Sequence, residues 1–272
     1  MQKQTQPIII FDSGVGGLTI YQEVKQMLPS LKVIYCSDSA GFPYGSRSES
    51  EVVDRTCHYL AELTRRYDPS LVVIACNTAS TVSLPRVRQI LDIPVVGVVP
   101  AIKTASERSE KRCIGLLATP GTVRREYTDQ LIHDFASDCQ VIRVGSSELV
   151  HLAEQYLRGE SIAQEVLKAI VAPFFAGKLR PDVIVLGCTH FPLLRDLLQS
   201  VVPCPVDWVD SGAAIARRVS YLLGMAPEEK AGAIRDIFIH TGELSDNGKI
   251  APALETMGFA RLISFDYQGA LI

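Results

Sequence analysis

Two stretches of the chain share one pattern: Pro69-Ser-Leu-Val-Val-Ile-Ala-Cys76-Asn77-Thr78 and Pro181-Asp-Val-Ile-Val-Leu-Gly-Cys188-Thr189-His190. In each, an apolar run separates a proline from a cysteine seven residues later, and polar residues follow the cysteine. A continuous apolar run of this kind is typical of a strand buried on both faces of a parallel sheet. The repetition therefore predicts two copies of one α/β unit, each presenting a thiol where a strand ends.

The repeat extends beyond these stretches. Downstream, Pro94-Val-Val-Gly-Val-Val-Pro100 parallels Pro205-Val-Asp-Trp-Val-Asp210 at nearly the same offset. Upstream, a weaker correspondence lays Phe11-Asp12-Ser13-Gly14 over Ala118-Thr119-Pro120-Gly121. We expect one unit over residues 8–100 and a second over 101–210. The remaining C-terminal residues have no counterpart, so they either cap the second unit or return to the first.

Runs rich in Ile and Val recur along the chain and predict the strands Ile8–Phe11, Val33–Cys36, Leu71–Cys76, Val95–Val99, Ile114–Ala118, Gln140–Val144, Val183–Gly187, Val206–Val209 and Ile237–Thr241. Amphipathic stretches between them predict helices over Ser48–Tyr67, Gly145–Leu157 and Ile162–Ala176, the last interrupted by Pro173. This alternation indicates a doubly wound α/β fold with parallel sheets.

The bulk composition is that of a soluble globular protein. The 272 residues are 47% hydrophobic and 21% charged, and the formal net charge of -3 gives no basic footprint for nucleic acid. No stretch reaches the roughly 18 apolar residues of a membrane span, and the polar Met1–Pro7 is followed by a run too short for a signal peptide. Seven cysteines without a C-x-x-C spacing argue against a disulfide framework or zinc knuckle. The expected compartment is the reducing cytoplasm.

Polar residues gather where the predicted strands end. In open parallel sheets, ligands bind beyond the carboxyl ends of the strands. If the two units face one another, these groups converge on one interdomain cleft, which we expect to be the active site. The residues at such ends are Asp12-Ser13, Ser37-Asp38, Cys76-Asn77-Thr78, Thr119 and Cys188-Thr189-His190.

Cys76 and Cys188 are the strongest candidates for chemistry. A lone cysteine at a strand end is usually only a small buried hydrophobe. Two cysteines at equivalent repeat positions instead indicate a site with a thiol on each side, able to remove a proton from one face of a carbon and return one to the other. A helix N-terminus facing each thiol would favour the thiolate. The other cysteines, interpreted as structural, are Cys36, Cys57, Cys113, Cys139 and Cys204.

The glycine-rich turn Asp12-Ser13-Gly14-Val15-Gly16-Gly17 resembles a nucleotide fingerprint, but the spacing fails because Thr19 stands where G-x-G-x-x-G needs its last glycine. Two interpretations stay open. The turn is purely structural, with a helix cap, or Ser13 and backbone N–H groups bind an anion while Asp12 assists a nearby thiol.

Other candidates are less specific. His190, two positions after Cys188, is a proton-transfer helper or a satisfied core residue. The turn containing Pro43, Tyr44 and Gly45 either is only a turn or closes a ligand pocket. Glu154 on its own is typical of a surface helix. The other histidines show no metal-ligand spacing, and we expect no metal.

Taken together, six motifs resemble the glutamate racemase family of the aspartate/glutamate racemase superfamily. They occur in order over essentially the whole chain: Phe11-Asp12-Ser13-Gly14-Val15-Gly16-Gly17-Leu18-Thr19, Pro43-Tyr44-Gly45, Ala75-Cys76-Asn77-Thr78-Ala79, Thr119-Pro-Gly-Thr122, Gly187-Cys188-Thr189-His190-Phe191-Pro192-Leu193 and Val209-Asp210-Ser211-Gly212.

The resemblance implies two pseudosymmetric doubly wound parallel-sheet domains, with residues 211–272 returning to the first domain (1–99) and 100–210 forming the second. It implies a racemase that interconverts L- and D-glutamate without a cofactor and supplies D-glutamate for peptidoglycan. Cys76 would take the α-proton of D-glutamate and Cys188 that of L-glutamate. Asp12 would assist Cys76, and His190 and Glu154 would assist Cys188. The resemblance assigns substrate binding to Asp12, Ser13, Pro43, Tyr44, Gly45, Cys76, Asn77, Thr78, Thr119, Thr122, Cys188, Thr189 and His190.

Several alternatives remain. A relative acting on aspartate, a hydantoin or a malonate is the nearest, although the two complete cysteine motifs favour glutamate. A two-lobed binding protein for a small anion is another, but it would have no need of paired thiols. The segment Leu116-Leu-Ala-Thr119-Pro-Gly-Thr122 resembles enteric-type members, some of which depend on a UDP-muramoyl-alanine precursor as activator. Activator dependence, gyrase binding and homodimer formation stay open at this point.

Overall fold

The chain divides into two compact units. A computed structural model describes residues 6–228, 236–242 and 250–265. One unit comprises Met1–Val98 with Gly212–Ile272, and the other Val99–Ser211. The chain passes from the first unit to the second after Val98 and returns to the first after Ser211. Residues 1–5 of the polar N-terminus lie outside the described residues, as do 229–235, 243–249 and 266–272 of the C-terminal segment.

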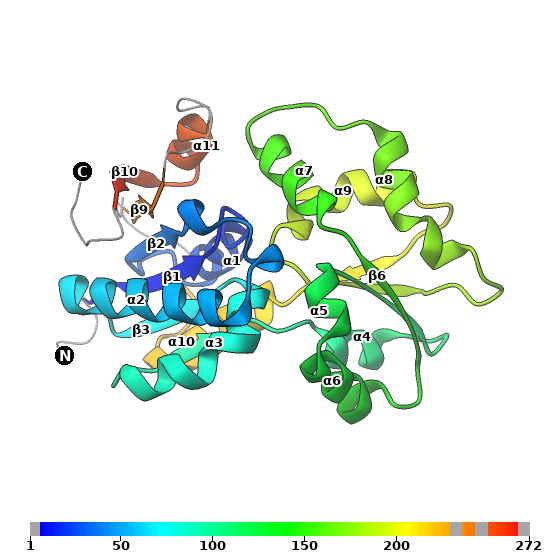
Figure 1. Cartoon of the computed structure of the whole chain (residues 1–272), viewed down its shortest axis with the longest axis horizontal. Helices are drawn as coiled ribbons and strands as arrows, with labels where there is room; N and C mark the ends of the chain where they lie inside the picture. Colours follow the sequence, from blue (N-terminus) through cyan, green and yellow to red (C-terminus); the bar gives the residue numbers. More distant parts are fainter. Residues whose placement is uncertain (1–5, 229–235, 243–249, 266–272) are drawn as a thin grey trace. The chain divides into compact units, whose positions relative to one another are not determined.

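Unit 1 is built on a six-stranded sheet with the order β10-β9-β2-β1-β3-β4 (Figure 1). All of its neighbouring strands run parallel. The strands are β1 (Ile8–Asp12), β2 (Val33–Ser37), β3 (Leu71–Ile74), β4 (Val95–Gly97), β9 (Asp236–His240) and β10 (Phe259–Ser264). The two strands from the C-terminal part extend the sheet next to β2, so the returning segment completes this unit.

Unit 2 contains a four-stranded parallel sheet with the order β6-β5-β7-β8. Its strands are β5 (Cys113–Ala118), β6 (Gln140–Gly145), β7 (Val183–Leu186) and β8 (Asp207–Val209). This order matches β2-β1-β3-β4 of unit 1 strand for strand. The predicted fold class, two pseudosymmetric parallel-sheet halves, is therefore confirmed in its topology.

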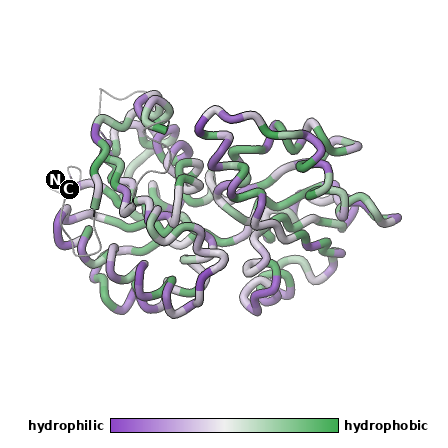
Figure 2. The backbone as a smooth tube through the Cα atoms, turned by 45° about the horizontal axis from the view of Figure 1, so that its top comes forward, coloured by the Kyte–Doolittle hydropathy of each residue, from purple (hydrophilic) through white to green (hydrophobic). Residues whose placement is uncertain are grey.

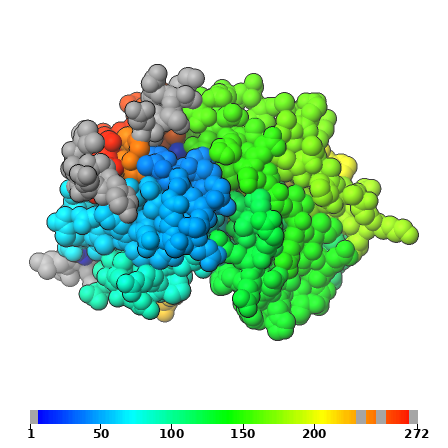
Figure 3. Space-filling model, viewed as in Figure 1, coloured from blue at the N-terminus to red at the C-terminus, as the bar shows by residue number. Residues whose placement is uncertain are grey.

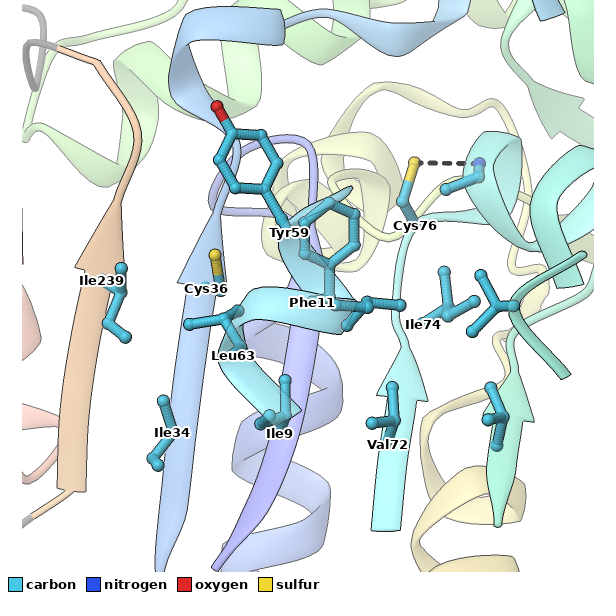
Figure 4. Close-up of a cluster of buried hydrophobic side chains, with 14 of the residues drawn as sticks. Ile9, Phe11, Ile34, Cys36, Tyr59, Leu63, Val72, Ile74, Cys76 and Ile239 are labelled. Atoms are coloured by element: carbon cyan, nitrogen blue, oxygen red, sulfur yellow. Dashed lines mark hydrogen bonds between the residues drawn. The ribbon is translucent and has the colours of Figure 1, made fainter. Parts of the chain in front are cut away.

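Helices cover both faces of the unit 1 sheet. On one face, α2 (Glu49–Tyr67) and α3 (Asn77–Ile90) pack on Ile9, Phe11 and Ile74 (Figure 4). On the other, Tyr21 of α1 (Leu18–Met27) stacks on Phe259, with ring centroids 4.4 Å apart. Helix α10 (Gly212–Leu223) packs on α1, and α11 (Ala251–Thr256) lies next to β10. Two 3-10 turns, η2 (Ser39–Gly41) and η3 (Tyr44–Ser46), follow β2.

Unit 2 is covered in the same way. Residues of α4 (Ile102–Arg108), α5 (Pro120–Arg124) and α6 (Glu126–Ala136) share a core with β5 and β7 on one face. On the other, a Cβ at Gly115 of β5 would meet the Phe174 ring at 2.8 Å, so glycine lets this ring pack on the sheet. That face carries α7 (Glu148–Leu157), α8 (Gln164–Val171) and α9 (Arg195–Val201), with the turns η4 (Ala172–Phe175) and η5 (Phe191–Leu194) in contact with them (Figure 1). Hydrophobic residues concentrate along the strands of both units (Figure 2).

The register of the strands corrects one detail of the repeat. Ala75 N–H donates to Phe11 O at 2.7 Å, and Gly187 N–H donates to Leu117 O at 2.8 Å. Phe11 thus corresponds to Leu117, and Ser13 corresponds to Thr119. The overlay of Phe11 on Ala118 was wrong by one residue. Such a slip would place every side chain on the opposite face of the strand.

Other boundaries also differ from expectation. Helix α7 begins only at Glu148, because Gly145 and the residues before it belong to β6. The α-helical part of Ile162–Ala176 ends at Val171, and Pro173 lies in the 3-10 turn that follows. Strand β3 ends at Ile74, two residues short of Cys76. Strand β10 was missed, because it is an edge strand whose middle residues are exposed rather than continuously apolar.

Candidate active site

In unit 1, Cys76 lies at the start of a helix. It is the N-cap residue of α3, and its Sγ accepts a hydrogen bond from Ala79 N–H at 3.5 Å (Figure 4). The side chain is buried at 7% exposure. A helix N-terminus carries partial positive charge and donor N–H groups, which favour the anionic form of a group placed there. The expected thiol beside a helix N-terminus is therefore present in this unit.

The glycine-rich turn after β1 brings two polar side chains to the carboxyl end of the sheet, where Cys76 follows β3. Ser13 Oγ lies 3.6 Å from Cys76 Sγ, and the buried carboxylate of Asp12 accepts a hydrogen bond from Gly14 N–H at 2.7 Å. Ser13 is not a helix cap, since Gly17 occupies the N-cap position of α1. A Cβ at Gly17 would lie 2.8 Å from Ala75 Cβ, so glycine there lets the turn approach β3. The turn thus packs against the end of β3 through Gly17, and it places the Ser13 hydroxyl beside the Cys76 sulfur.

The remaining unit 1 candidates divide into buried and exposed groups. Asn77 and Thr78, in the first turn of α3, are buried, as is Tyr44. Pro43 is half-buried and Gly45 exposed. The hydroxyl of Tyr44 donates to Asp38 Oδ2 at 2.5 Å. Burial, then the charge of Asp38 and this hydrogen bond, raise the pKa of Tyr44 far above its ordinary value. The phenol therefore stays protonated and is held by Asp38.

In unit 2, three side chains form a hydrogen-bonded chain around Cys188. His190 Nδ1 lies 3.8 Å from Cys188 Sγ, and His190 Nε2 lies 2.9 Å from Glu154 Oε1. Cys188 and His190 are buried, and the side chain of Glu154 is only 15% exposed. Glu154 comes from α7, which packs on η5, the turn that begins immediately after His190. The surface-helix interpretation of Glu154 is therefore wrong.

The partners of His190 determine its protonation. Burial lowers the pKa of this imidazole, but the hydrogen bonds to Cys188 and Glu154, together with their negative charge, outweigh burial and hold the pKa well above its usual value. Carboxylate and sulfur on either side stabilise the imidazolium. His190 can therefore hand a proton to Cys188 or take one from it.

The two thiols differ in their local structure. Cys188 does not cap an α-helix, because a 3-10 turn starting at Phe191 follows it. The expectation of a helix N-terminus at both cysteines is thus correct for Cys76 and wrong for Cys188. In unit 2, the His190 imidazole lies beside the sulfur, whereas in unit 1 the neighbours of the sulfur include the Ala79 N–H and the Ser13 hydroxyl. A thiolate in unit 2 is therefore stabilised by a cation rather than by a helix dipole.

Three threonines complete the unit 2 candidates. Thr119 and Thr122 are buried, and their Oγ1 atoms lie 2.9 Å apart across the first turn of α5. Thr189 is buried beside Cys188. Strands β5 and β7 are neighbours, so Thr119 and Cys188 both follow the carboxyl ends of adjacent strands. A Cβ at Gly187 would lie 3.0 Å from Ala118 Cβ, which shows how closely the two strand ends approach.

These arrangements are suited to acid–base chemistry by thiols. All seven cysteines are free, and the two candidates are buried beside hydrogen-bonding groups: Ser13 and Ala79 N–H at Cys76, and His190 at Cys188. Within the described residues, no group of three or more His, Cys, Asp or Glu side chains is arranged to hold a metal ion. No helix in that part of the chain is long and apolar enough to cross a membrane.

Comparison with known proteins agrees with the geometry. Residues 14–219 match the sequence profile of the Asp/Glu/hydantoin racemase family. A glutamate racemase of Escherichia coli O7:K1 is 46% identical over 255 residues, 94% of this chain and 90% of the relative. The chain belongs to the Asp/Glu/hydantoin racemase family.

Solved structures of the family extend the likeness to the whole fold. Escherichia coli glutamate racemase, in complex with L-glutamate and the activator UDP-MurNAc-ala, has a TM-score of 0.89 and 45% identity, with coverage of 98% of this chain and 99% of that one. A glutamate racemase isoform from Bacillus anthracis has a TM-score of 0.81 and 27% identity, with coverage of 95% and 97%.

One hydrogen-bonded cluster in unit 1 escaped the sequence analysis. Asp38 was noted only as a polar residue at a strand end, and Arg55 and Thr241 were assigned no role. The structure brings them together, since Arg55 and Thr241 both donate to the Asp38 carboxylate. The only sequence feature that could have indicated this cluster was the position of Asp38 directly after β2. The partner Thr241 is 203 residues away and becomes visible only in the fold.

Proposed function

We propose that this protein is a glutamate racemase that interconverts L- and D-glutamate by two thiols and without a cofactor. The observation that carries the proposal is the equivalence of Cys76 and Cys188. Each follows, by two residues, the strand residue that pairs with the opening strand of its unit: Ile74 with Phe11, and Leu186 with Leu117. A duplicated fold with a buried thiol at this same position in each copy matches a reaction whose substrate and product are mirror images.

The proposed reaction proceeds in two proton transfers. For L-glutamate, the Cys188 thiolate removes the α-proton, and the Cys76 thiol donates its proton to the opposite face of the resulting carbanion. For D-glutamate, the roles reverse. Each turnover leaves the two thiols in exchanged protonation states, so both directions need both groups. Removing a weakly acidic α-proton also requires stabilisation of the negative charge on the substrate carboxylate.

The assisting residues are assigned by their contacts. His190 lies within reach of Cys188 and is held by Glu154, so we assign these two to proton transfer at Cys188. Asp12, at the end of the strand next to β3, is assigned to Cys76. Substrate carboxylates and the ammonium group are assigned to the buried hydroxyl, amide and turn groups already identified: Ser13, Pro43, Tyr44, Gly45, Asn77, Thr78, Thr119, Thr122 and Thr189.

The physiological setting follows from the activity. We propose that the protein supplies D-glutamate for peptidoglycan synthesis in the cytoplasm. The similarity to an Escherichia coli enzyme solved with UDP-MurNAc-ala supports activation of this chain by a UDP-muramoyl-alanine precursor. Such activation by a precursor would couple the supply of D-glutamate to the availability of that precursor.

Proton NMR tests the activity. Purified protein in D2O is incubated with L-glutamate or, separately, L-aspartate, with and without UDP-MurNAc-alanine and with no other addition. We expect loss of the α-proton signal for glutamate only, with the nucleotide raising the rate. Exchange of aspartate alone would transfer the chain to a neighbouring branch of the family. No exchange under any condition would refute the racemase proposal.

A further inference from the structure

We propose that Thr241 and Arg55 are positioning residues for the substrate-binding turn Pro43-Tyr44-Gly45, and that they act through the buried carboxylate of Asp38. The inference rests on the proposed function, which assigns this turn to substrate. It adds Arg55 and Thr241, the latter from the C-terminal part of the chain, to the residues that support substrate binding in the unit of Cys76.

Asp38 is the centre of a cluster that comprises Asp38, Tyr44, Arg55 and Thr241. Its carboxylate has no exposed surface. Arg55 donates from Nε to Oδ2 at 2.6 Å and from Nη2 to Oδ1 at 2.7 Å. Thr241 Oγ1 donates to Oδ1, and Tyr44 donates to Oδ2. Both oxygens therefore have two donors, which compensates the cost of burying the charge.

The cluster connects the turn to the end of β9. Thr241 N–H donates to Ser37 O at 3.1 Å, and Thr241 Oγ1 accepts from Ala40 N–H at 3.2 Å. Gly242 N–H donates to Ser39 Oγ at 3.1 Å. The hydroxyl of Thr241 is thus both a donor to Asp38 and an acceptor for the backbone of the loop after β2. No other single side chain of the cluster makes both kinds of contact in the described residues.

Steric contacts leave the cluster little freedom. A Cβ at Gly41 would lie 2.5 Å from Arg55 Nε, 2.5 Å from Asp38 Oδ2 and 2.8 Å from the Tyr44 ring. A Cβ at Gly242 would lie 3.0 Å from Ala40 N. Both glycines permit backbone to approach where any side chain would collide. Gly41 and Tyr44 are therefore buried against the cluster, although the same loop contains the exposed Ala40 and Gly45.

The cluster also lies near the reacting thiol. The Tyr44 ring packs beside Phe11, with centroids 6.4 Å apart, and Phe11 directly precedes Asp12 and Ser13. The η3 turn that begins with Tyr44 packs on α3, the helix capped by Cys76. Residues from η3 to the start of α2, in blue, reach the surface of unit 1 (Figure 3). The turn is thus placed to present donors to a substrate, while the cluster holds Tyr44 in position.

The consequence is a preorganised binding turn. If the turn had to be ordered on binding, part of the binding free energy of glutamate would be spent on that ordering, and the apparent affinity would fall by the fraction of molecules with a disordered turn. Weakening the cluster should therefore raise KM more than it lowers kcat. A purely structural role would instead lower the amount of folded, active protein and leave KM unchanged.

Three threonine variants test the inference. Thr241→Val removes the donor to Asp38 and the acceptor for Ala40, whereas Thr241→Ser keeps both. Thr56→Val is the matched control, because Thr56 is buried in the same unit and its hydroxyl makes no hydrogen bond among the described residues. Racemisation kinetics and hydrogen exchange of the amides in 39–46 are measured for each variant beside the wild type.

For Thr241→Val we expect KM for glutamate to rise about tenfold or more, with a smaller change in kcat and faster exchange in 39–46. Thr241→Ser and Thr56→Val should retain the wild-type KM and protection. Arg55→Lys, which keeps the charge but loses the two-point contact, should behave like Thr241→Val.

A wild-type KM in Thr241→Val would overturn the inference, whether or not the amides of 39–46 exchange faster. A KM increase in Thr56→Val equal to that in Thr241→Val would also overturn it. Either result would leave the proposed function intact, because that function is judged on the wild-type protein alone, by its exchange of the glutamate α-proton.

Discussion

Ser13 and Thr119 occupy equivalent positions in the two sheets, yet their hydroxyls contact different groups. Ser13 Oγ lies 3.6 Å from Cys76 Sγ, whereas Thr119 Oγ1 lies 2.9 Å from Thr122 Oγ1. In unit 2, the sulfur of Cys188 has His190 as its neighbour instead. The two halves of the repeat thus share topology but differ in chemistry. We expect their two thiols to be stabilised by different groups.

Replacing either thiol should stop racemisation. A serine hydroxyl is far less acidic than a thiol, so Cys76→Ser and Cys188→Ser should each lower the rate of racemisation by at least about a hundredfold, the smallest effect expected for loss of a general acid or base. Polarimetry of L- and D-glutamate measures both directions. Cys204→Ser, at a half-buried cysteine interpreted as structural, is the control and should retain activity. Near-normal activity in either catalytic variant would disprove the pairing of the thiols.

Removing the cation beside Cys188 should slow both directions equally. The enantiomers of glutamate have equal free energies, so kcat/KM must fall by the same factor from either side. For His190→Asn we expect a loss of about 10²–10⁴, typical of a proton-transfer group. Glu154→Gln keeps a hydrogen-bond acceptor for His190 but removes the charge, and should cost less. In our account Glu154 acts on Cys188 only through His190. A larger loss for Glu154→Gln than for His190→Asn would contradict this assignment.

His190 should also make stability depend on pH. Its pKa is raised in the folded protein, so the folded state holds this proton to a higher pH than the unfolded chain, whose histidine pKa is about 6.5. The stabilisation is fully present below that value and is lost as the pH rises through the folded pKa. The free energy of unfolding of the wild type, relative to His190→Asn, should therefore fall as the pH rises above about 6.5. A difference that stays constant or grows would contradict the raised pKa.

The turn after β1 should not tolerate a larger residue at Gly17. A Cβ there would lie 2.8 Å from Ala75 Cβ and 2.9 Å from Tyr35 Oη. We expect Gly17→Ala to reduce the free energy of unfolding by about 1–3 kcal/mol, the usual cost of overpacking, and to lower activity by displacing Asp12 and Ser13. Gly177→Ala, where the nearest atom is 3.6 Å away, is the control. Equal stability of the two variants in urea would contradict the close approach of the turn to β3.

The sequence predicted most of the fold because its parallel strands are buried on both faces. The residues of β1, β3 and β7 are all buried, and each was visible as a continuous apolar run. Edge strands give a weaker signal. In β10, Arg261 and its neighbours are exposed, so this strand could not be distinguished from a loop or helix end. Strand register was also misjudged at Ala118, because register depends on hydrogen bonds between strands that a single chain pattern does not reveal.

The sequence predicted only those residues of the candidate site that stand in a local motif. Cys76, Cys188 and His190 stand in strong local motifs, so the sequence alone singled them out. Glu154 has no local signal and entered through the family resemblance; its contact with His190 depends on how α7 packs on η5. Thr241 is the extreme case, because its role depends on Asp38, a residue more than two hundred positions away.

The central claim, that one thiol removes the α-proton and the other supplies a different one, can be tested directly with isotopes. L-glutamate is converted in D2O to an early time point, and the deuterium content of each enantiomer is measured by mass spectrometry after chiral separation. Our account predicts that the first D-glutamate formed carries deuterium while the remaining L-glutamate keeps its proton. Early D-glutamate that retains the original proton would show that a single base serves both faces, and would contradict the account.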